Sequence, residues 1–228
     1  MAITKEDPQG VSRFRVKVTK NGPYLVSGGL PLSEQRIRVD SKGQPDGWEK
    51  GSKLPTPKVY TLCRCGHSRS QPFCDGSHAG IGFNGKETAA RKPYAAQAVE
   101  INGPELLLTD AEDLCAGSRF CHRAGGIWKL TRKSRDPKAR QTAIEEACDC
   151  PSGRLVVWDK KGKAIEPRLK PSIALVVEPQ ADHAGPVWVR GGIPVESADG
   201  STYEIRNRVT LCCCGKSAKK PFCDASHL

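Results

Sequence analysis

The stretch that decides the fold is CRCGHSRSQPFCDGSH, residues 63–78, and a close copy, CCCGKSAKKPFCDASH, occupies residues 212–227. Both copies place their cysteines and histidine in the spacing Cys-x-Cys-x8-Cys-x3-His. The candidate ligands are Cys63, Cys65, Cys74 and His78 in the first copy, and Cys212, Cys214, Cys223 and His227 in the second. Thiolate and imidazole suit zinc or iron–sulfur centres. The duplication therefore predicts two metal sites of one kind.

The repeat extends upstream of the cysteines. GPYLVSGGLPL (22–32) and GPVWVRGGIPV (185–195) share the pattern G-P-x-x-V-x-G-G-[LI]-P-[LV]. A β-like run follows each copy and leads into its cysteine motif. The first copy has the longer connection, and we expect its extra residues in the Gly/Pro/Lys-rich stretch 41–57. The duplicated unit is therefore a strand-rich segment together with its cysteine motif.

Short β-like runs dominate the chain, and turn residues bound several of them. We expect strands over 14–18, 23–26, 35–39, 58–62, 105–109, 154–158, 172–177, 187–189, 202–206 and 208–211. Asp199-Gly200 predicts a hairpin turn. The clearest helix is 138–148, because Ala139, Ala143, Ile144 and Ala147 fall on one face.

These elements predict a mainly β fold with small helices, of the α+β class, in three parts. The parts are a first β-rich unit (1–95), a middle segment (96–160) and a second β-rich unit (161–228). The chain has 228 residues, which is enough to bury a core without cross-links. The eleven cysteines are therefore not needed as disulfide staples.

The composition limits which cell compartment and which partners we expect for this protein. The N-terminal residues form no apolar signal segment, and no stretch approaches a membrane span. We therefore expect a soluble, cytoplasmic protein whose thiols stay reduced. The formal net charge is +11, which fits a solvated surface or the steering of an acidic protein partner. We expect no nucleic-acid binding, since basic residues do not interleave with aromatics.

The ligand spacing has a local logic. Cys-x-Cys brings two thiolates together on extended chain, while Cys-x3-His would place both side chains on one face of a helix. Asp75 and Asp224 would then cap free amides in the first turn of that helix. Pro72 and Pro221 would end any preceding regular structure. Three cysteines and one histidine also form a common zinc set, so spacing alone leaves zinc open.

The pattern C-x-C-x2-S-x3-P-x-C-D-G-S-H resembles the signature of the CDGSH iron–sulfur (mitoNEET-like) family, of the tandem-motif bacterial type. Residues 63–78 match it in full, and residues 212–227 match it except for Ala225 in place of glycine. The resemblance implies one [2Fe-2S] cluster per motif, held by the three cysteines and the histidine. Single-motif chains of this family commonly pair, so we predict an intramolecular pseudo-dimer, monomeric overall, with the two GPxxV strands packing together.

The copies differ in ways that bear on function. Ala225 replaces the motif glycine, Cys213 stands where the first copy has Arg64, and His227 is followed only by Leu228, which predicts a frayed ligand. Cations flank both motifs: Arg64, His67 and Arg69 in the first, and Lys216, Lys219 and Lys220 in the second. They could stabilise a reduced cluster and dock an acidic partner, or be solvated loop charges.

One histidine per site has two expected consequences. Histidine ligation raises the reduction potential of a two-iron cluster relative to four cysteines, as in Rieske centres. Imidazole can also be protonated and released, which would make the cluster acid-labile and transferable. We therefore expect His78 and His227 to control the reduction potential and the release of the clusters.

The middle segment resembles single-cluster bacterial ferredoxins, although more loosely. Its candidate ligands are Cys115, Cys121 and Cys150, with Cys148 as a possible fourth. A degenerate segment that has lost its cluster is the alternative. His122 is expected to be a loop residue rather than a ligand.

The sequence thus predicts a non-enzymatic electron carrier with two [2Fe-2S] clusters. The first alternative is a cluster donor, or redox or pH sensor, that delivers a cluster to an apo-acceptor protein. The second is a structural zinc module with a basic interaction surface. We see neither a nucleophile–base constellation nor a phosphate-binding glycine loop.

Overall fold

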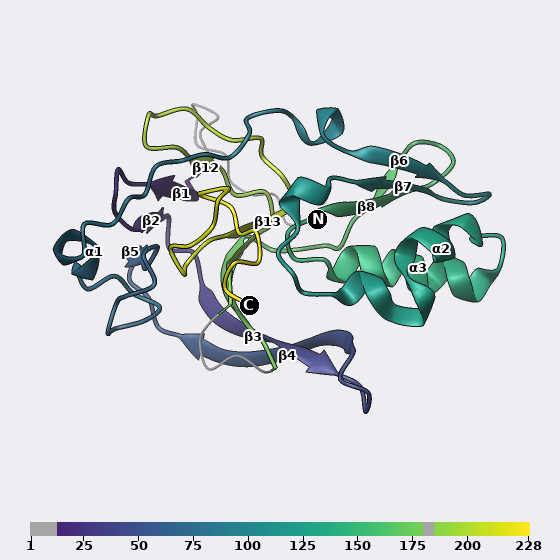
Figure 1. Cartoon of the computed structure of the whole chain (residues 1–228), viewed down its shortest axis with the longest axis horizontal. Coiled ribbons are helices and arrows are strands. Elements are labelled where there is room, and N and C mark those ends of the chain that lie inside the picture. The colour runs from purple at the N-terminus through teal and green to yellow at the C-terminus, as the bar shows by residue number, and fades with distance from the viewer. Residues whose placement is uncertain (1–12, 180–184) are drawn as a thin grey trace.

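Two β-sheets, each built from both repeats, form one part of the molecule, and a third sheet with two helices forms the other (Figure 1). The computed structural model describes residues 13–179 and 185–228, so the start of the predicted first unit lies outside it. Within these ranges no helix has the length and apolar composition that crossing a bilayer requires.

The two repeats exchange strands. The first unit supplies β1 (Arg15–Val18), β2 (Tyr24–Ser27), β3 (Leu32–Val39), β4 (Pro45–Leu54) and β5 (Val59–Leu62). The second supplies β10 (Ser172–Val177), β11 (Val187–Arg190), β12 (Val195–Glu196) and β13 (Arg208–Leu211). The sheet orders are β12-β1-β2-β5 and β13-β11-β10-β3-β4. Each sheet therefore contains a strand from the opposite unit, which gives the predicted intramolecular pseudo-dimer.

The exchanged strands pair in parallel with their new neighbours. Val16 of β1 lies opposite Val195 of β12, and Leu32 of β3 lies opposite Ile173 of β10. Alternate residues of β1 and β2 are buried, as a sheet with one face on a core requires. The GPxxV strands β2 and β11 lie in different sheets but bury Val26 and Val189 in the same hydrophobic core. This shared core joins the two units.

The extra connection of the first unit is a strand rather than a loop. β4 pairs antiparallel with β3. Trp48 of β4 packs against Phe120 and Trp188, with ring centroids 4.8 and 4.7 Å apart. These aromatic contacts fix β4 between the second unit and the middle segment, which the Gly/Pro/Lys-rich composition did not indicate.

The strand predicted over 202–206 is wrong. Only Thr202 forms an isolated bridge, to Glu196, and the chain then leaves the sheet. Its polar side chains contact other parts of the chain instead: Glu204 accepts the amide of Tyr94, just before the middle segment, at 2.6 Å, and Arg206 donates to the Gly153 carbonyl of the middle segment. The predicted turn at 199–200 is present, since the Ser197 amide donates to the Ser201 carbonyl at 2.8 Å.

The middle segment is a four-stranded sheet covered by a helical hairpin. Its strands are β6 (Val99–Asn102), β7 (Leu107–Asp110), β8 (Leu155–Trp158) and β9 (Ala164–Ile165), in that order. The helices are α2 (Ile127–Arg132) and α3 (Pro137–Asp149), and short 3-10 turns cover Tyr94–Ala96, Glu112–Leu114 and Phe120–Gly125. Together they enclose a separate hydrophobic core.

The helix predicted over 138–148 is confirmed as α3. Asp136 caps it by accepting the Ala139 amide at 3.0 Å, and a proline occupies its first turn. The predicted apolar face is the one that packs on the core: Ala139, Ala143 and Ala147 are buried, and Ile144 is partly buried.

Candidate metal centres

The first cysteine loop presents its ligands in two pairs. Cys63 Sγ and Cys65 Sγ lie 3.8 Å apart. Two thiolates on one tetrahedral metal, each at about 2.3 Å, would lie about 3.8 Å apart. On the other side of the loop, Cys74 Sγ lies 3.3 Å from His78 Nδ1.

The second loop repeats this geometry. Cys212 Sγ and Cys214 Sγ lie 3.7 Å apart, and Cys223 Sγ lies 3.5 Å from His227 Nδ1. A hydrogen bond with the Cys212 thiol lowers the pKa of Cys214 and raises that of Cys212. One member of the pair is therefore ready to bind metal as a thiolate.

Motif residues that are not ligands hold the loop in shape. Ser68 Oγ donates to the Phe73 carbonyl at 2.6 Å, and the Cys63 amide donates to the Pro72 carbonyl at 2.8 Å. Asp75 accepts the amides of Arg69 at 2.9 Å and Ser77 at 3.0 Å. Hydrogen bonds from Ser77, and then from Arg69, hold the pKa of Asp75 well below its ordinary value.

The second loop has the same internal bonds. Ser217 Oγ donates to the Phe222 carbonyl at 2.7 Å, and Asp224 accepts the amides of Ala218 at 2.7 Å and Ser226 at 3.1 Å. The serine and aspartate of the motif therefore close the loop around the ligands, which explains why the spacing is identical.

The helix expected from cysteine to histidine is absent from the described residues of the second site, and at the first site it is limited to one short helix that contains His78. The short helix α1 (Ser77–Gly80) begins only after Cys74, and the described second motif contains bends and turns there. Asp75 accepts the amide of Ser77, the first residue of α1, at 3.0 Å, and it also accepts the Arg69 amide of its own loop at 2.9 Å. A tight turn through Gly76, rather than a helix, brings cysteine and histidine together.

The turn needs a left-handed residue. Gly76 has φ 90°, and Ala225 occupies the equivalent position with φ 70°. A Cβ at Gly76 would meet no atom within 4 Å, whereas a Cβ at Gly117 of the middle segment would lie 2.8 Å from Ala225 Cβ and 2.6 Å from Leu228 Cδ1. Ala225 therefore packs the second loop against the middle segment, which offsets the strain of its positive φ.

The two loops also meet each other. Cys65 and Cys214 form an isolated antiparallel bridge. A Cβ at Gly66 would lie 2.6 Å from the Cys214 carbonyl oxygen, and a Cβ at Gly215 would lie 2.6 Å from that of Cys65. Only glycine allows this close approach, which puts Cys65 of one candidate centre beside Cys214 of the other.

The residue inside each Cys-x-Cys pair has a structural role. Arg64 is buried, donates to the Thr19 carbonyl at 3.1 Å and to the Gly85 carbonyl, and lies over the Tyr24 ring. The expectation that Arg64 could dock a partner is therefore wrong. Its counterpart Cys213 donates to the Gly185 carbonyl at 3.0 Å, and burial raises the pKa of this thiol.

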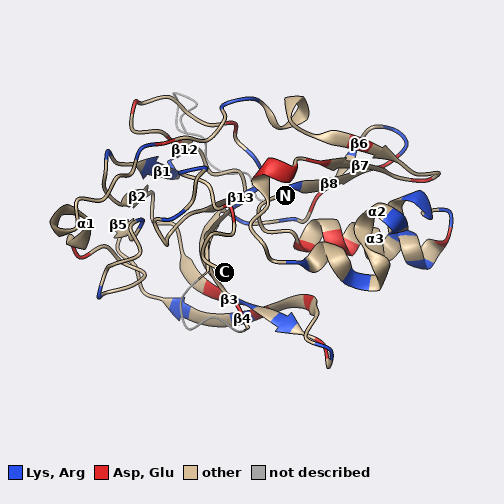
Figure 2. Cartoon of the chain, in the orientation of Figure 1, with Lys and Arg blue, Asp and Glu red and all other residues tan. Residues whose placement is uncertain are grey.

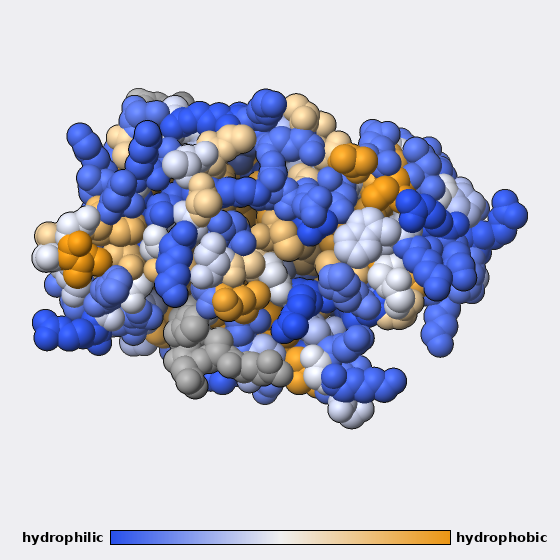
Figure 3. All heavy atoms as spheres, in the orientation of Figure 1, coloured by the Kyte–Doolittle hydropathy of each residue, from blue (hydrophilic) through white to orange (hydrophobic). Residues whose placement is uncertain are grey.

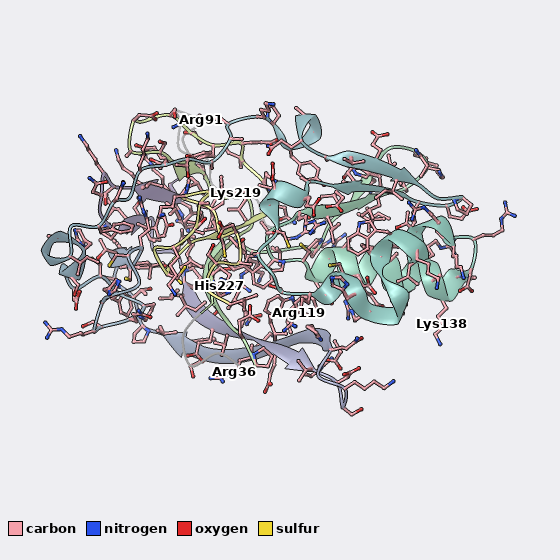
Figure 4. All side chains as sticks on the ribbon, in the orientation of Figure 1. Arg36, Arg91, Arg119, Lys138, Lys219 and His227 are labelled. Atoms are coloured by element: carbon pink, nitrogen blue, oxygen red, sulfur yellow. The ribbon has the colours of Figure 1, made fainter. Side chains whose placement is uncertain are left out.

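The two histidines differ in exposure. His78 is half-buried, whereas the His227 side chain is only 2% exposed. Figure 4 labels His227 near the centre of the view. The expectation of a frayed ligand at this position is wrong, since the Leu228 amide donates to the Ala225 carbonyl at 3.0 Å.

The middle segment brings three of its four candidate cysteines together. Cys115, Cys121 and Cys150 line one small cavity with Ser118 and Arg154. Burial, and then the neighbouring Cys150, raise the pKa of Cys121 to about 12. The buried Ser118 hydroxyl has no hydrogen-bond partner among the described residues, so the cavity offers an open polar position.

The fourth candidate points elsewhere. Cys148 Sγ lies 3.8 Å from the Ile165 carbonyl, outside the lining of this cavity. The exposed His122 lies in the 3-10 turn Phe120–Gly125 rather than in a loop, and its ring centroid is 5.8 Å from that of Trp128. Arg154 pairs with Asp110 at 2.6 Å beside the cysteines; the sequence did not single it out, because nothing in the ligand spacing points to it.

Comparison with protein families agrees with this geometry. A family described as iron-binding zinc finger CDGSH type matches residues 21–79 and 184–228, and a family described as divergent 4Fe-4S mono-cluster matches residues 101–160. Searches of curated proteins and of solved structures gave no match. The chain is an iron–sulfur protein. It belongs to the CDGSH family, as a tandem form whose two CDGSH regions flank an iron–sulfur-like middle segment.

Proposed function

We propose that each CDGSH loop holds one [2Fe-2S] cluster through its three cysteines and its histidine, and that the protein is an electron carrier rather than an enzyme. The paired ligand geometry carries this proposal. Each loop offers a Cys–Cys pair at 3.8 or 3.7 Å and a Cys–His pair at 3.3 or 3.5 Å. One pair suits each iron of a two-iron cluster. When bound, the clusters supply one-electron redox chemistry.

The same pairing argues against a single zinc ion. A structural zinc ion needs four ligands that converge on one point. Over residues 13–179 and 185–228, no group of three or more His, Cys, Asp or Glu side chains is arranged to hold a single metal ion. None of the eleven cysteines forms a disulfide, which suits a metal-binding protein in a reducing compartment such as the cytoplasm.

The arrangement of the sites supports electron transfer. The loops bridge directly between Cys65 and Cys214, and the second loop packs on Gly117, inside the ferredoxin-like loop that carries Cys115 and Cys121. The three cysteine sites are therefore neighbours in a row. We place a third cluster at the middle site, on Cys115, Cys121 and Cys150, with a non-cysteine group completing its ligands.

Cluster donation is the second candidate, and the exposure of His78 favours it at the first site. Release begins when a proton or an acceptor reaches the histidine nitrogen. His78 is half-buried, so water can reach it, whereas the His227 side chain is 2% exposed. The first site is the better donor to an apo-acceptor protein.

An acidic protein remains our proposed partner. Of the cations beside the loops, Arg69 and Lys216 are exposed, while Lys219 pairs with Asp113 at 2.6 Å. Figure 2 shows further Lys and Arg positions, together with acidic ones, along the α2–α3 hairpin. The face in Figure 3 is largely hydrophilic with scattered apolar side chains, so charge would guide docking on that face.

Metal and sulfide analysis with a visible spectrum tests the proposal. We expect about four iron and four sulfide per chain from two [2Fe-2S] clusters, and more if the middle site is filled. A colourless protein with stoichiometric zinc would contradict it. Mixing the loaded protein with an apo-ferredoxin separates donation from electron transfer, because only donation moves iron to the acceptor.

A further inference from the structure

A buried carboxylate faces the histidine of the second site. Glu178 Oε1 lies 3.8 Å from His227 Nε2, and the two side chains are 6% and 2% exposed. Glu178 Oε1 accepts no hydrogen bond from the described residues. A buried carboxylate is costly unless a donor or a cation faces it. Since His227 Nδ1 faces Cys223 at 3.5 Å, the other ring nitrogen is the donor that Glu178 meets.

The first site lacks this carboxylate because its hairpin is shorter. Between β1 and β2 the chain turns tightly, and the Gly22 amide donates to the Thr19 carbonyl at 3.2 Å. A Cβ at Gly22 would lie 3.6 Å from His78 Nε2, so Gly22 lies against this nitrogen. The equivalent connection, from β10 to β11, is longer and begins with Glu178. Within the described residues, His78 forms no ion pair with a carboxylate.

We propose that Glu178 is a positioning residue that holds His227 through Nε2, gives the second cluster a lower reduction potential than the first, and slows the loss of that cluster. The inference rests on the proposed [2Fe-2S] function. A carboxylate that accepts the outer N–H of a metal-bound histidine orients the ring and makes it a more basic ligand. Negative charge beside a cluster also disfavours its reduction.

The test measures the potential of each cluster separately. Full-length protein carrying Cys74→Ser leaves only the second CDGSH cluster, and Cys223→Ser leaves only the first. Glu178→Gln keeps the side-chain shape and removes the charge. In the Cys74→Ser background we expect about a tenfold rise in the reduced-to-oxidised ratio at fixed potential, which is about 59 mV for one electron. We also expect faster loss of visible absorbance at neutral pH.

Two controls separate this role from a general effect of charge. Glu178→Gln in the Cys223→Ser background should leave the first potential unchanged. Glu196→Gln removes a carboxylate of the second unit that pairs with Arg15 and Lys17 instead of a histidine, and it should shift neither potential. Equal shifts at both sites, or an equal shift from Glu196→Gln, would overturn the inference.

A conservative variant covers the case in which Glu178→Gln fails to bind its cluster. Glu178→Asp keeps the charge but withdraws it from His227 by one methylene, so in the Cys74→Ser background the second potential should rise above that of the protein with Glu178. A second potential identical to that of the parent protein would overturn the inference. If the parent protein binds no [2Fe-2S] cluster, the proposed function itself fails. If its clusters form and Glu178 variants change nothing, only this inference fails.

Discussion

The two CDGSH sites have the same ligands and the same internal loop bonds, yet they lie in different surroundings. The first loop leaves His78 half-buried beside a short turn at Gly22. The second loop buries His227 next to Glu178, and Ala225 and Leu228 of the same loop lie against Gly117 of the middle segment. We therefore expect motif residues to set what a site can bind, and residues outside the motif to set how easily the site loses or reduces its cluster.

The largest expected effect comes from removing one ligand set at a time. Cys74→Ser should remove the first cluster alone, and Cys223→Ser the second alone, because the four ligands of each site come from one loop. Each variant should lose half of the iron held by the two CDGSH sites. Iron and sulfide analysis checks this. Loss of both clusters from either variant would show that the bridge between the loops makes them one unit.

Gly117→Ala should weaken the second site selectively. Its Cβ would lie 2.6 Å from Leu228 and 2.8 Å from Ala225, and overpacking of this kind costs about 1–3 kcal/mol. Gly162→Ala is the matched control, since Gly162 has φ 77° and open space around it. Urea titration gives the free energy of unfolding, and iron analysis in the Cys74→Ser background gives second-site occupancy. If both variants lose the same unfolding free energy and the same amount of second-site iron, backbone strain alone explains the effect of Gly117→Ala, and the prediction of selective weakening is wrong.

Tyr24→Phe should also affect the second site, although Tyr24 belongs to the first unit. Its hydroxyl donates to the carbonyls of Cys212 at 2.7 Å and Pro221 at 3.0 Å. Burial raises the pKa of Tyr24 well above its ordinary value, so it remains a donor. The loss should cost about 1–2 kcal/mol of unfolding free energy. Tyr60→Phe, which removes a bond to the Leu30 carbonyl, should leave second-site iron unchanged; equal iron loss would contradict the account.

The smallest expected effects are at the left-handed turn. Gly76→Ala adds a Cβ in open space at φ 90°, so it should cost about 1–2 kcal/mol from backbone strain alone. Ala225→Gly relieves that strain but loses packing on the middle segment, so it should change stability by less than about 1 kcal/mol. Denaturation of the two variants compares them directly. A large gain from Ala225→Gly would show that the packing contributes nothing.

Much of this architecture follows from the sequence. The repeat predicts the two units, and their exchange of β3 and β12 makes the pseudo-dimer within one chain. The helix α3 was predictable because Asp136, Pro137 and three buried alanines give it a cap and one apolar face. Ligand pairing was predictable because short spacing keeps the side chains together whatever the surroundings.

Features that depend on distant contacts were not predictable from the sequence. The local sequence predicts that Arg64 is a surface cation. In the structure it is buried against the Thr19 and Gly85 carbonyls and two aromatic rings. The local sequence predicts a loop where β4 forms. The strand depends on its pairing with β3 and on the packing of Trp48, and local propensity does not include either contact. The pairing of Glu178 with His227 joins residues far apart in the sequence, and no spacing rule relates them.

The loop itself does not explain acid lability at moderate pH. Hydrogen bonds lower the pKa of Asp75, so its contribution to stability is present above the ordinary aspartate pKa of about 3.9 and is lost only as pH falls through the lower folded value. At about pH 5.5 the first loop keeps these bonds. Cluster loss at that pH therefore reports on the histidine ligand and its access to water.

The measurement that tests the central comparison most directly is the rate of cluster loss at about pH 5.5, where free histidine becomes protonated. Visible absorbance is followed in the Cys223→Ser protein, which has only the first CDGSH cluster, and in the Cys74→Ser protein, which has only the second. The account predicts faster loss from the first site, because His78 is half-buried while the His227 side chain is 2% exposed. Equal rates, or faster loss from the second site, would contradict it.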